Sequence, residues 1–180
     1  LEQATTLGAS GAELETLLFN TEFSGHRIWR AVIDLGGGEG EDDTSRPEEV
    51  FGWLRANNRG RGCQVYGVRG SAHRLPSMLK IGKPIDKTPA GKPFPGGMQI
   101  IYIDTFQSKD AFFWHLDKAK LGENGAFYLN KDLGEDFARQ ITAEEKRKDR
   151  RGIEYYHQLR RDNHALDCCS YLFAPILHEL

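Results

Sequence analysis

The stretch from Arg27 to Gly38 constrains the fold more than any other part of the sequence. It reads Arg-Ile-Trp-Arg-Ala-Val-Ile-Asp and continues directly into Leu-Gly-Gly-Gly. A short, partly β-branched apolar run that stops at glycines is typical of a strand buried on both faces of a sheet. Its last residue, Asp34, is then expected at the carboxyl end of that strand, where open α/β folds place their ligands. Aspartate before glycines is also ordinary turn chemistry, so the stretch alone leaves both interpretations open.

The residues that follow predict a βαβ unit. Ser45 is a suitable N-cap for a helix over 46–58, and the run 63–68 reads as the next strand. Strand, helix and strand at this spacing form a parallel pair, so Arg69 is expected to leave the second strand at the same rim as Asp34. The sequence therefore predicts an α/β fold. Further helices are expected over 12–19, 108–122 and 132–140, and a helical or turn segment over 142–145.

Three more polar residues fall where a site would need them. A third strand is expected to end at Asp104. A helix over 162–177 has apolar residues at 3, 4, 7 spacing, with His164 and Asp167 on a neighbouring face. Carboxylates that converge with Asp34 would bind Mg²⁺ or Mn²⁺, because these ions prefer oxygen ligands. Two such ions can activate water and stabilise the leaving oxygen in phosphodiester cleavage.

Composition excludes several classes of protein. With 180 residues, 39% of them hydrophobic and 28% charged, the chain is ordinary for a globular domain. A net charge of −2 means that any nucleic-acid site is a local patch. No apolar run is long enough to span a bilayer, and the N-terminus lacks a signal-peptide pattern. Three cysteines, two of them adjacent, argue against a disulfide framework and for a reducing compartment. No Cys-x-x-Cys spacing is present, so a zinc site is not expected. Because the first residue is Leu1, we expect a piece of a longer chain, with a loose segment over 1–11 and one domain over 12–180.

Residues 75–97 predict a long basic loop. This stretch holds five of the seven prolines and four lysines against a single acid. An extended basic segment suits contact with a phosphate backbone, whereas a mobile solvated loop is the alternative. The candidate DNA contacts are Arg69, Lys80, Lys83, Lys87 and Lys92.

Four blocks of sequence carry a resemblance to a known family. The blocks are Val32 to Gly37, Tyr66 to Gly70, Phe137 to Glu145, and Asn163 to Cys168 with Tyr171 and Ala174. The Gln-x-Thr-Ala-Glu and Asn-His-Ala-Leu-Asp-Cys motifs in the last two blocks are specific when taken together. In order and rough spacing, from about Glu13 to Ala174, the blocks resemble the C-terminal nuclease region of lambda-type, GpA-like phage terminase large subunits.

The resemblance implies an RNase H-like mixed sheet flanked by helices, and an endonuclease with a two-metal Mg²⁺ or Mn²⁺ site. It carries the family's strand-end aspartate to Asp34 and the late-helix acid to Asp167. Many members have Glu where this chain has His164, so a ligand there would be nitrogen rather than oxygen. The family's first strand, with its first catalytic aspartate, has no counterpart in 1–11, and no ATPase Walker motif is present. Asp34 and Asp167 are the predicted catalytic metal ligands, and His164 and Asp104 are secondary candidates.

The same resemblance implies cutting of concatemeric double-stranded DNA during packaging, in the cytoplasm of an infected or prophage-bearing bacterial host. The expected partners are double-stranded DNA, an ATPase domain in the same polypeptide, the terminase small subunit and the portal of the procapsid. No membrane partner is expected. One alternative is a non-catalytic module that grips DNA or docks on the portal. It would bind DNA with strong salt dependence and without cleavage. Another is a metal-independent nucleotide-binding protein, which nucleotide alone would stabilise.

Overall fold

The computed structural model describes residues 7–23, 25–36, 46–57, 62–87, 91 and 93–178. By its contacts, the chain divides into two compact units, and the single domain expected over 12–180 stays a prediction. Unit 1 comprises Leu1–Gly70, Leu79–Tyr102 and Ala174–Leu180, and unit 2 comprises Ser71–Met78 and Ile103–Phe173. Among the described helices, none is long and apolar enough to cross a membrane.

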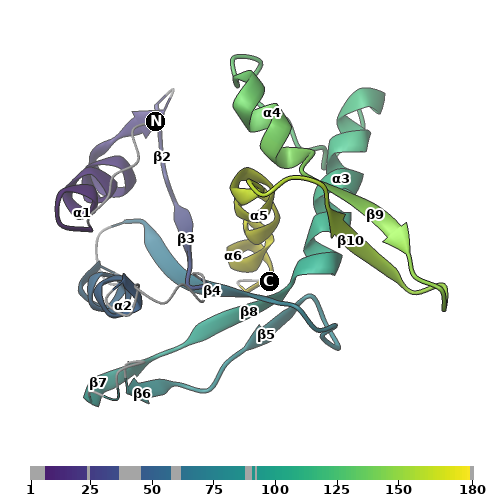
Figure 1. The fold of residues 1–180 in the computed structure, drawn as a ribbon. Coiled ribbons are helices and arrows are strands. Elements are labelled where there is room, and N and C mark those ends of the chain that lie inside the picture. The colour runs from purple at the N-terminus through teal and green to yellow at the C-terminus, as the bar shows by residue number, and fades with distance from the viewer. Residues whose placement is uncertain are drawn as a thin grey trace. The chain divides into compact units, whose positions relative to one another are not determined.

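The predicted βαβ unit is present. Strands β3 (Arg30–Asp34) and β4 (Gln64–Ser71) are parallel, and helix α2 (Arg46–Asn57) connects them (Figure 1). The register places Arg30 opposite Gln64 and Asp34 opposite Val68. Strand prediction succeeded because β-branched residues between glycine-rich breaks specify extended backbone locally.

The sheet that contains this pair is mixed. Its strand order is β3-β4-β8-β5, with β8 at Ile100–Asp104 and β5 at Leu79–Ile81. Gly82 N donates to Ile100 O at 2.8 Å, and Asp104 N donates to Met78 O at 2.9 Å. From the first bond to the second, the residue numbers rise along β8 and fall along β5, so these two strands are antiparallel. The α/β class is therefore confirmed.

Strand β3 is less buried than the sequence predicts. In the order β3-β4-β8-β5 it is a terminal strand, with one neighbour among the described residues. Its first four residues are half-buried and Asp34 is exposed, whereas Val65 and Val68 of β4 are buried. The prediction of a strand buried on both faces is wrong. An apolar run indicates a strand, but it does not specify which other elements cover that strand.

The core of unit 1 lies between the sheet and its helices. Helix α1 (Leu7–Glu15) continues into a π-helical turn, η1 (Thr16–Asn20), so the helix begins earlier than the predicted residue 12. Part of the predicted loose segment is thus helical, and residues 1–6 lie outside the described residues. A short hairpin, β1 (Glu22–Phe23) and β2 (His26–Arg27), follows. The buried core residues are Leu18, Leu35, Phe51, Leu54, Cys63, Val65, Met98 and Ile100.

The Pro- and Lys-rich stretch 75–97 is more regular than one loop. It contains β5, strand β6 (Ile85–Lys87) and most of strand β7 (Pro93–Met98). Strands β6 and β7 pair antiparallel with an irregular register, Ile85 with Met98 and Lys87 with Pro93. Proline is tolerated there because strands with few ladder partners lose little when one N–H is missing.

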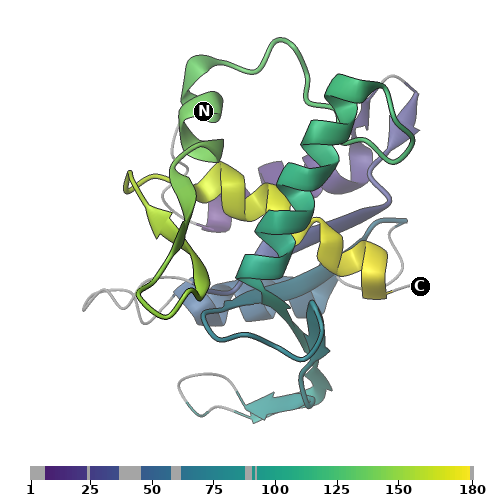
Figure 2. The same cartoon turned by 90° about the vertical axis from the view of Figure 1, so that its right-hand side faces the viewer.

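Unit 2 is built on helix α3 (Thr105–Leu121), which packs against helix α5 (His164–Tyr171) (Figure 2). Phe112 and Leu166, both fully buried, lie at the centre of this packing, and Phe113 and Leu116 pack around them. The helix was expected to open at Ser108, but it begins three residues earlier. Asp104 caps it instead, and buried Ser108 donates its hydroxyl to Thr105 O.

Two further expectations hold only in part. The segment 142–145 begins with a turn, as expected, but Glu144 starts strand β9 (Glu144–Lys148), which follows helix α4 (Glu135–Ile141) and forms a hairpin with β10 (Glu154–Gln158). The single helix predicted over 162–177 is two helices, α5 and α6 (Phe173–His178). Pro175 explains the break, because it has no N–H to donate to Tyr171 O and its ring clashes with that carbonyl.

Candidate functional site

Asp34 lies at the carboxyl end of the parallel pair in unit 1. Its Oδ1 accepts a hydrogen bond from Gly36 N at 2.8 Å, so the carboxylate is oriented by the turn that ends β3. Leu35 N donates to Val68 O at 2.7 Å, and Arg69 Nη2 donates to Leu35 O at 3.1 Å. Arg69 therefore lies beside the end of β3, as predicted, but it belongs to β4 rather than following it, because β4 continues to Ser71. Both Asp34 and Arg69 are exposed.

Asp167 belongs to a buried ionic cluster in unit 2. The ammonium of Lys109, on α3, lies 3.0 Å from Asp167 Oδ1 and 2.7 Å from Glu144 Oε1. The side chains of Lys109 and Glu144 are each 7% exposed, and that of Asp167 is 25% exposed. Asn163 Nδ2 donates to the same Glu144 oxygen at 2.7 Å. The Lys109 network consists of these four residues: Lys109, Glu144, Asn163 and Asp167.

The two late motifs hold each other in place. Gln140 Oε1 accepts from Ala165 N at 3.0 Å, which satisfies a free N–H in the first turn of α5. Leu159 N donates to the carbonyl of fully buried Ala143 at 2.7 Å. Together with the bond from Asn163 to Glu144, these contacts join the end of α4 and the start of β9 to the start of α5. The Gln-x-Thr-Ala-Glu motif thus positions the helix that carries Asp167.

Asp104 caps helix α3. Its Oδ1 accepts from Gln107 N at 2.9 Å, and its Oδ2 accepts from Leu75 N at 2.8 Å and from Gln107 Nε2 at 2.9 Å. Burial opposes ionisation of this carboxyl, but these bonds and nearby Arg74 outweigh burial and hold its pKa below the usual value. Capping accounts for the position of Asp104 at a strand end. Its role as a metal ligand stays a prediction.

The remaining predicted residues that the structure describes lie at the surface. His164 is the exposed first residue of α5. Lys80 on β5, Lys87 on β6 and Lys83 between them are exposed in unit 1, and Lys92 lies outside the described residues. Asp34 belongs to unit 1, whereas Asp104, His164 and Asp167 belong to unit 2. The convergence of Asp34 with Asp167 therefore stays a prediction.

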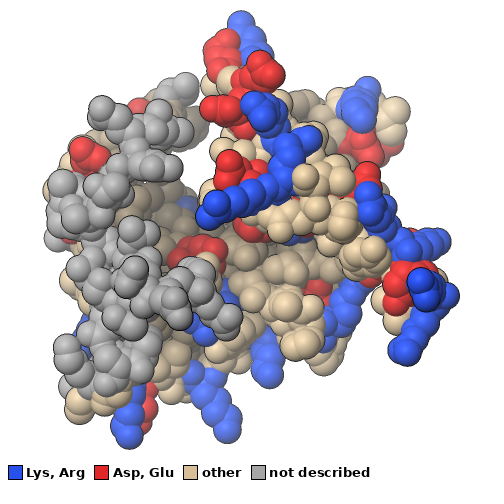
Figure 3. Space-filling model, viewed as in Figure 1, with Lys and Arg blue, Asp and Glu red and all other residues tan. Residues whose placement is uncertain are grey.

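The basic residues of the β9–β10 hairpin are largely paired. Lys146 lies 2.8 Å from Asp110 Oδ2 and 2.9 Å from Glu154 Oε2, and Lys148 lies 3.6 Å from Glu154 Oε1. In Figure 3, blue and red side chains intermix on this hairpin. Lys146 also approaches the ring of Phe106, at 4.8 Å from its centroid. The hairpin is a solvated surface of mixed charge.

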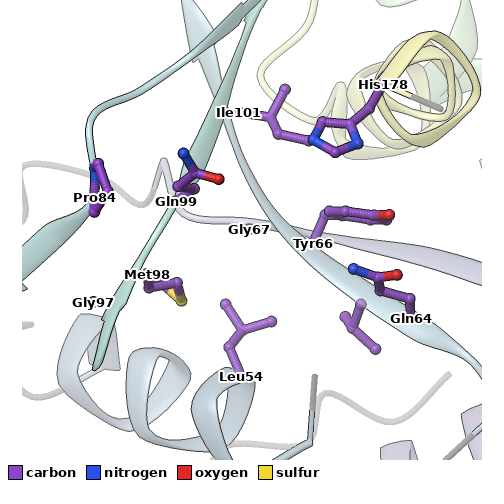
Figure 4. Close-up of a pocket in the computed structure, with 11 residues that line it drawn as sticks. Leu54, Gln64, Tyr66, Gly67, Pro84, Gly97, Met98, Gln99, Ile101 and His178 are labelled. Carbon is purple, nitrogen blue, oxygen red and sulfur yellow. The ribbon is translucent and has the colours of Figure 1, made fainter. Parts of the chain in front are cut away.

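The structure contains two cavities relevant to a site. The cavity in unit 1, about 420 Å³, is lined by Tyr66 and His178, whose ring centroids lie 5.1 Å apart, and none of the predicted site residues lines it (Figure 4). The cavity in unit 2, about 240 Å³, is lined in part by Asp104, Lys109 and Glu144. The cavity in unit 2 therefore opens on the Lys109 network, and we regard it as the more relevant of the two.

The donor chemistry fits an oxygen-preferring metal only in part. Carboxylates such as Asp34 and Asp167 are the ligands that Mg²⁺ and Mn²⁺ favour. Over the described ranges, no three His, Cys, Asp or Glu side chains gather as a metal site would require. At Asp167 the positive charge comes from Lys109. The three cysteines form no disulfide.

Sequence reasoning missed Lys109, Glu144 and Asn163 as members of a site. Glu144 and Asn163 lie within the two motifs that carry the resemblance, so the motifs held a signal for them. Lys109 had none, because a lysine near the start of an amphipathic helix usually faces solvent.

Comparison with known proteins identifies the family. The family model for the terminase large subunit gpA endonuclease domain matches residues 13–178, which include Asp34, Asp167 and the whole Lys109 network. No curated protein matches the chain, and no solved structure does. The match covers most of the chain and confirms the resemblance seen in the motifs. The chain therefore belongs to the gpA-type phage terminase large subunits, as their endonuclease domain, in the machinery of phage DNA packaging.

Proposed function

We propose that this domain is a Mg²⁺- or Mn²⁺-dependent endonuclease in which Asp34 and Asp167 are metal ligands. The family match over 13–178 carries the proposal, because it spans both acids. Asp34 supports it by its exposed position at the end of a strand, with one oxygen oriented by Gly36 N. Asp167 supports it because its carboxylate is held in a defined place by Lys109. His164 and Asp104 are secondary candidates for the same role.

The proposed reaction is hydrolysis of a phosphodiester bond in concatemeric double-stranded DNA. Bound at such carboxylates, two divalent ions would activate water and stabilise the leaving oxygen. The residues of the chain would orient these ions and the DNA: Asp34 and Asp167 as ligands, and Arg69 as a phosphate contact beside Asp34. Lys80, Lys83, Lys87 and Lys92 are proposed as further phosphate contacts, which would make binding depend strongly on salt.

The proposed fold is RNase H-like. Two features support this assignment: a parallel pair whose first strand ends in an acid, and a late helix with a second acid. We also propose that the domain works beside an ATPase domain of the same polypeptide, with the small subunit and the portal as partners. The site of action is the cytoplasm of the infected or prophage-bearing host cell.

The assignment is tested by metal-dependent nicking of supercoiled plasmid DNA. With Mn²⁺ present, Asp34→Asn and Asp167→Asn are each expected to lower the nicking rate about a hundredfold or more, because each removes an anionic ligand. Asp117→Asn is the matched control, since Asp117 is an exposed residue on α3 that pairs only with Lys120 in the described contacts. Circular dichroism checks that every variant is folded. Full activity in both Asp34→Asn and Asp167→Asn would contradict the assignment.

The same samples separate the two main functions. Salt-dependent DNA binding without nicking at any Mn²⁺ or Mg²⁺ concentration would favour a non-catalytic module that grips DNA. Nicking that EDTA abolishes and Mn²⁺ restores would support the nuclease.

A further inference from the structure

The ammonium of Lys109 occupies the position of a cation between two acids. It lies 2.7 Å from Glu144 Oε1 and 3.0 Å from Asp167 Oδ1, and these acids come from β9 and α5. Lys109 is 6% exposed, so water screens these charges only weakly. Without a positive charge between them, two carboxylates so close to one point would repel each other strongly.

The spacing resembles that of a bridging metal. A divalent ion that joins two carboxylates lies about 2.0–2.5 Å from each oxygen. A contraction of about 0.2–1.0 Å per bond would bring these two oxygens to the distances of metal ligands. Asn163 Nδ2 already fixes Glu144 Oε1 at 2.7 Å, so the acid would not have to reorient.

We propose that Lys109 is a built-in counter-ion that positions Glu144 and Asp167 and competes with a divalent cation for these two carboxylates. The inference rests on the proposed function insofar as Asp167 is a metal ligand. Lys109 is then a positioning residue, and a cation that reaches Asp167 must share or displace its ammonium. Glu144 becomes part of the site, which the motifs alone did not assign.

A second lysine in the same unit provides a matched comparison. Lys146 also lies between two acids, 2.8 Å from Asp110 and 2.9 Å from Glu154, but its side chain is 38% exposed. Solvent screens such a pair, so loss of this charge changes the local potential less than loss of Lys109. The comparison isolates burial and the presence of Asp167 as the features that matter.

The test measures Mn²⁺ binding directly. The metal-free chain is titrated with Mn²⁺, and free Mn²⁺ is followed by its electron paramagnetic resonance signal. Lys109→Gln is expected to tighten the dissociation constant about tenfold or more, because it removes a positive charge adjacent to the ligands. Lys109→Arg, which keeps the charge, is expected to bind Mn²⁺ like the wild type, and so is Lys146→Gln. A merely structural role of Lys109 would not tighten metal binding.

Two more variants locate the effect and protect the test against misfolding. The double variant Lys109→Gln/Glu144→Gln is expected to lose the gain in affinity, because only one carboxylate remains beside the vacant position. Lys109→Met keeps the length of the side chain without its charge, and replaces Lys109→Gln if that variant unfolds. An unchanged or weaker Mn²⁺ affinity in Lys109→Gln and Lys109→Met overturns the proposal. A gain that persists in the double variant overturns it as well.

This measurement and the nicking assay fail separately. If Asp167→Asn abolishes nicking while Lys109→Gln leaves Mn²⁺ affinity unchanged, the nuclease assignment stands and the counter-ion role is wrong. If the wild type nicks no DNA but Lys109→Gln gains Mn²⁺ affinity, the counter-ion role stands and the nuclease assignment is wrong.

Discussion

Gly67 on β4 allows Leu35 to pack beside the end of the site strand, and Gly67→Ala tests this packing. A Cβ at position 67 would lie 2.6 Å from Leu35 Cδ1 and 3.3 Å from Leu54 Cδ1. Leu35 is 7% exposed and Leu54 is 1% exposed, so neither can swing out into solvent. Leu35 immediately follows Asp34, and its N–H donates to Val68 O at 2.7 Å.

The magnitude follows from this overlap. Carbon atoms pack at about 3.5–4.0 Å, so Leu35 Cδ1 must move by roughly 1 Å. Overpacking of a core costs about 1–3 kcal/mol. Alanine loses less backbone entropy on folding than glycine does, and this difference offsets about 0.5–1 kcal/mol of the cost of overpacking. We therefore expect Gly67→Ala to lower the free energy of unfolding by about 1–2 kcal/mol.

Urea denaturation of the purified chain measures the change. Gly52→Ala is the control, because Gly52 lies in α2 with no atom within 4 Å of its added Cβ, and this change should be neutral or stabilising. Leu35→Ala removes the colliding Cδ1. In the Leu35→Ala background, Gly67→Ala should therefore cost little, and the double-mutant cycle should show a coupling energy of about 1 kcal/mol or more.

Two results would refute the steric argument. Gly67→Ala as stable as the wild type would show that Leu35 relaxes without cost. An equal loss of stability in the Leu35→Ala background would place the collision elsewhere.

Two further changes test the supports of unit 2 by urea unfolding. Because the pKa of Asp104 is lowered in the fold, its contribution is fully present above the unfolded value of about 3.9 and is lost as the pH falls through the lower folded value. Asp104→Asn should thus lower the free energy of unfolding by about 2 kcal/mol near neutral pH and by less in strong acid. A difference between variant and wild type that does not change with pH would contradict this. Gln140→Ala removes the acceptor for Ala165 N and should lower the free energy of unfolding by about 1 kcal/mol. Gln140→Glu keeps an acceptor at the N-terminus of α5 and should not lower it. Equal losses in both variants would argue against a capping role.

Local sequence was sufficient for the parts of the fold that depend on nearby residues. Apolar runs between glycines predicted β3 and β4, and the crossover over 46–58 predicted that they run parallel. Both are properties of short segments, so pattern and connection length determine them. The motifs likewise indicated the family, which the family model confirms, and they predicted Asp34 and Asp167 as site residues.

Local patterns failed where long-range packing or one overlooked residue decided the outcome. The apolar run of β3 predicted full burial, but burial depends on which elements cover the strand. A periodic apolar stripe predicted one helix over 162–177, and Pro175 divided it. The pattern predicted that Asp104 ends a strand, but it did not predict the hydrogen bonds that the Asp104 oxygens accept from Leu75 and Gln107.

The sequence by itself therefore determined the class of the fold and the family, and it predicted Asp34 and Asp167 as metal ligands. Only the tertiary structure decided that Lys109 lies between Asp167 and Glu144. The physical reason is that the environment of an ionic side chain depends on which elements fold over it. The partner Glu144 is 35 residues away from Lys109 in sequence, and no periodicity along α3 predicts it.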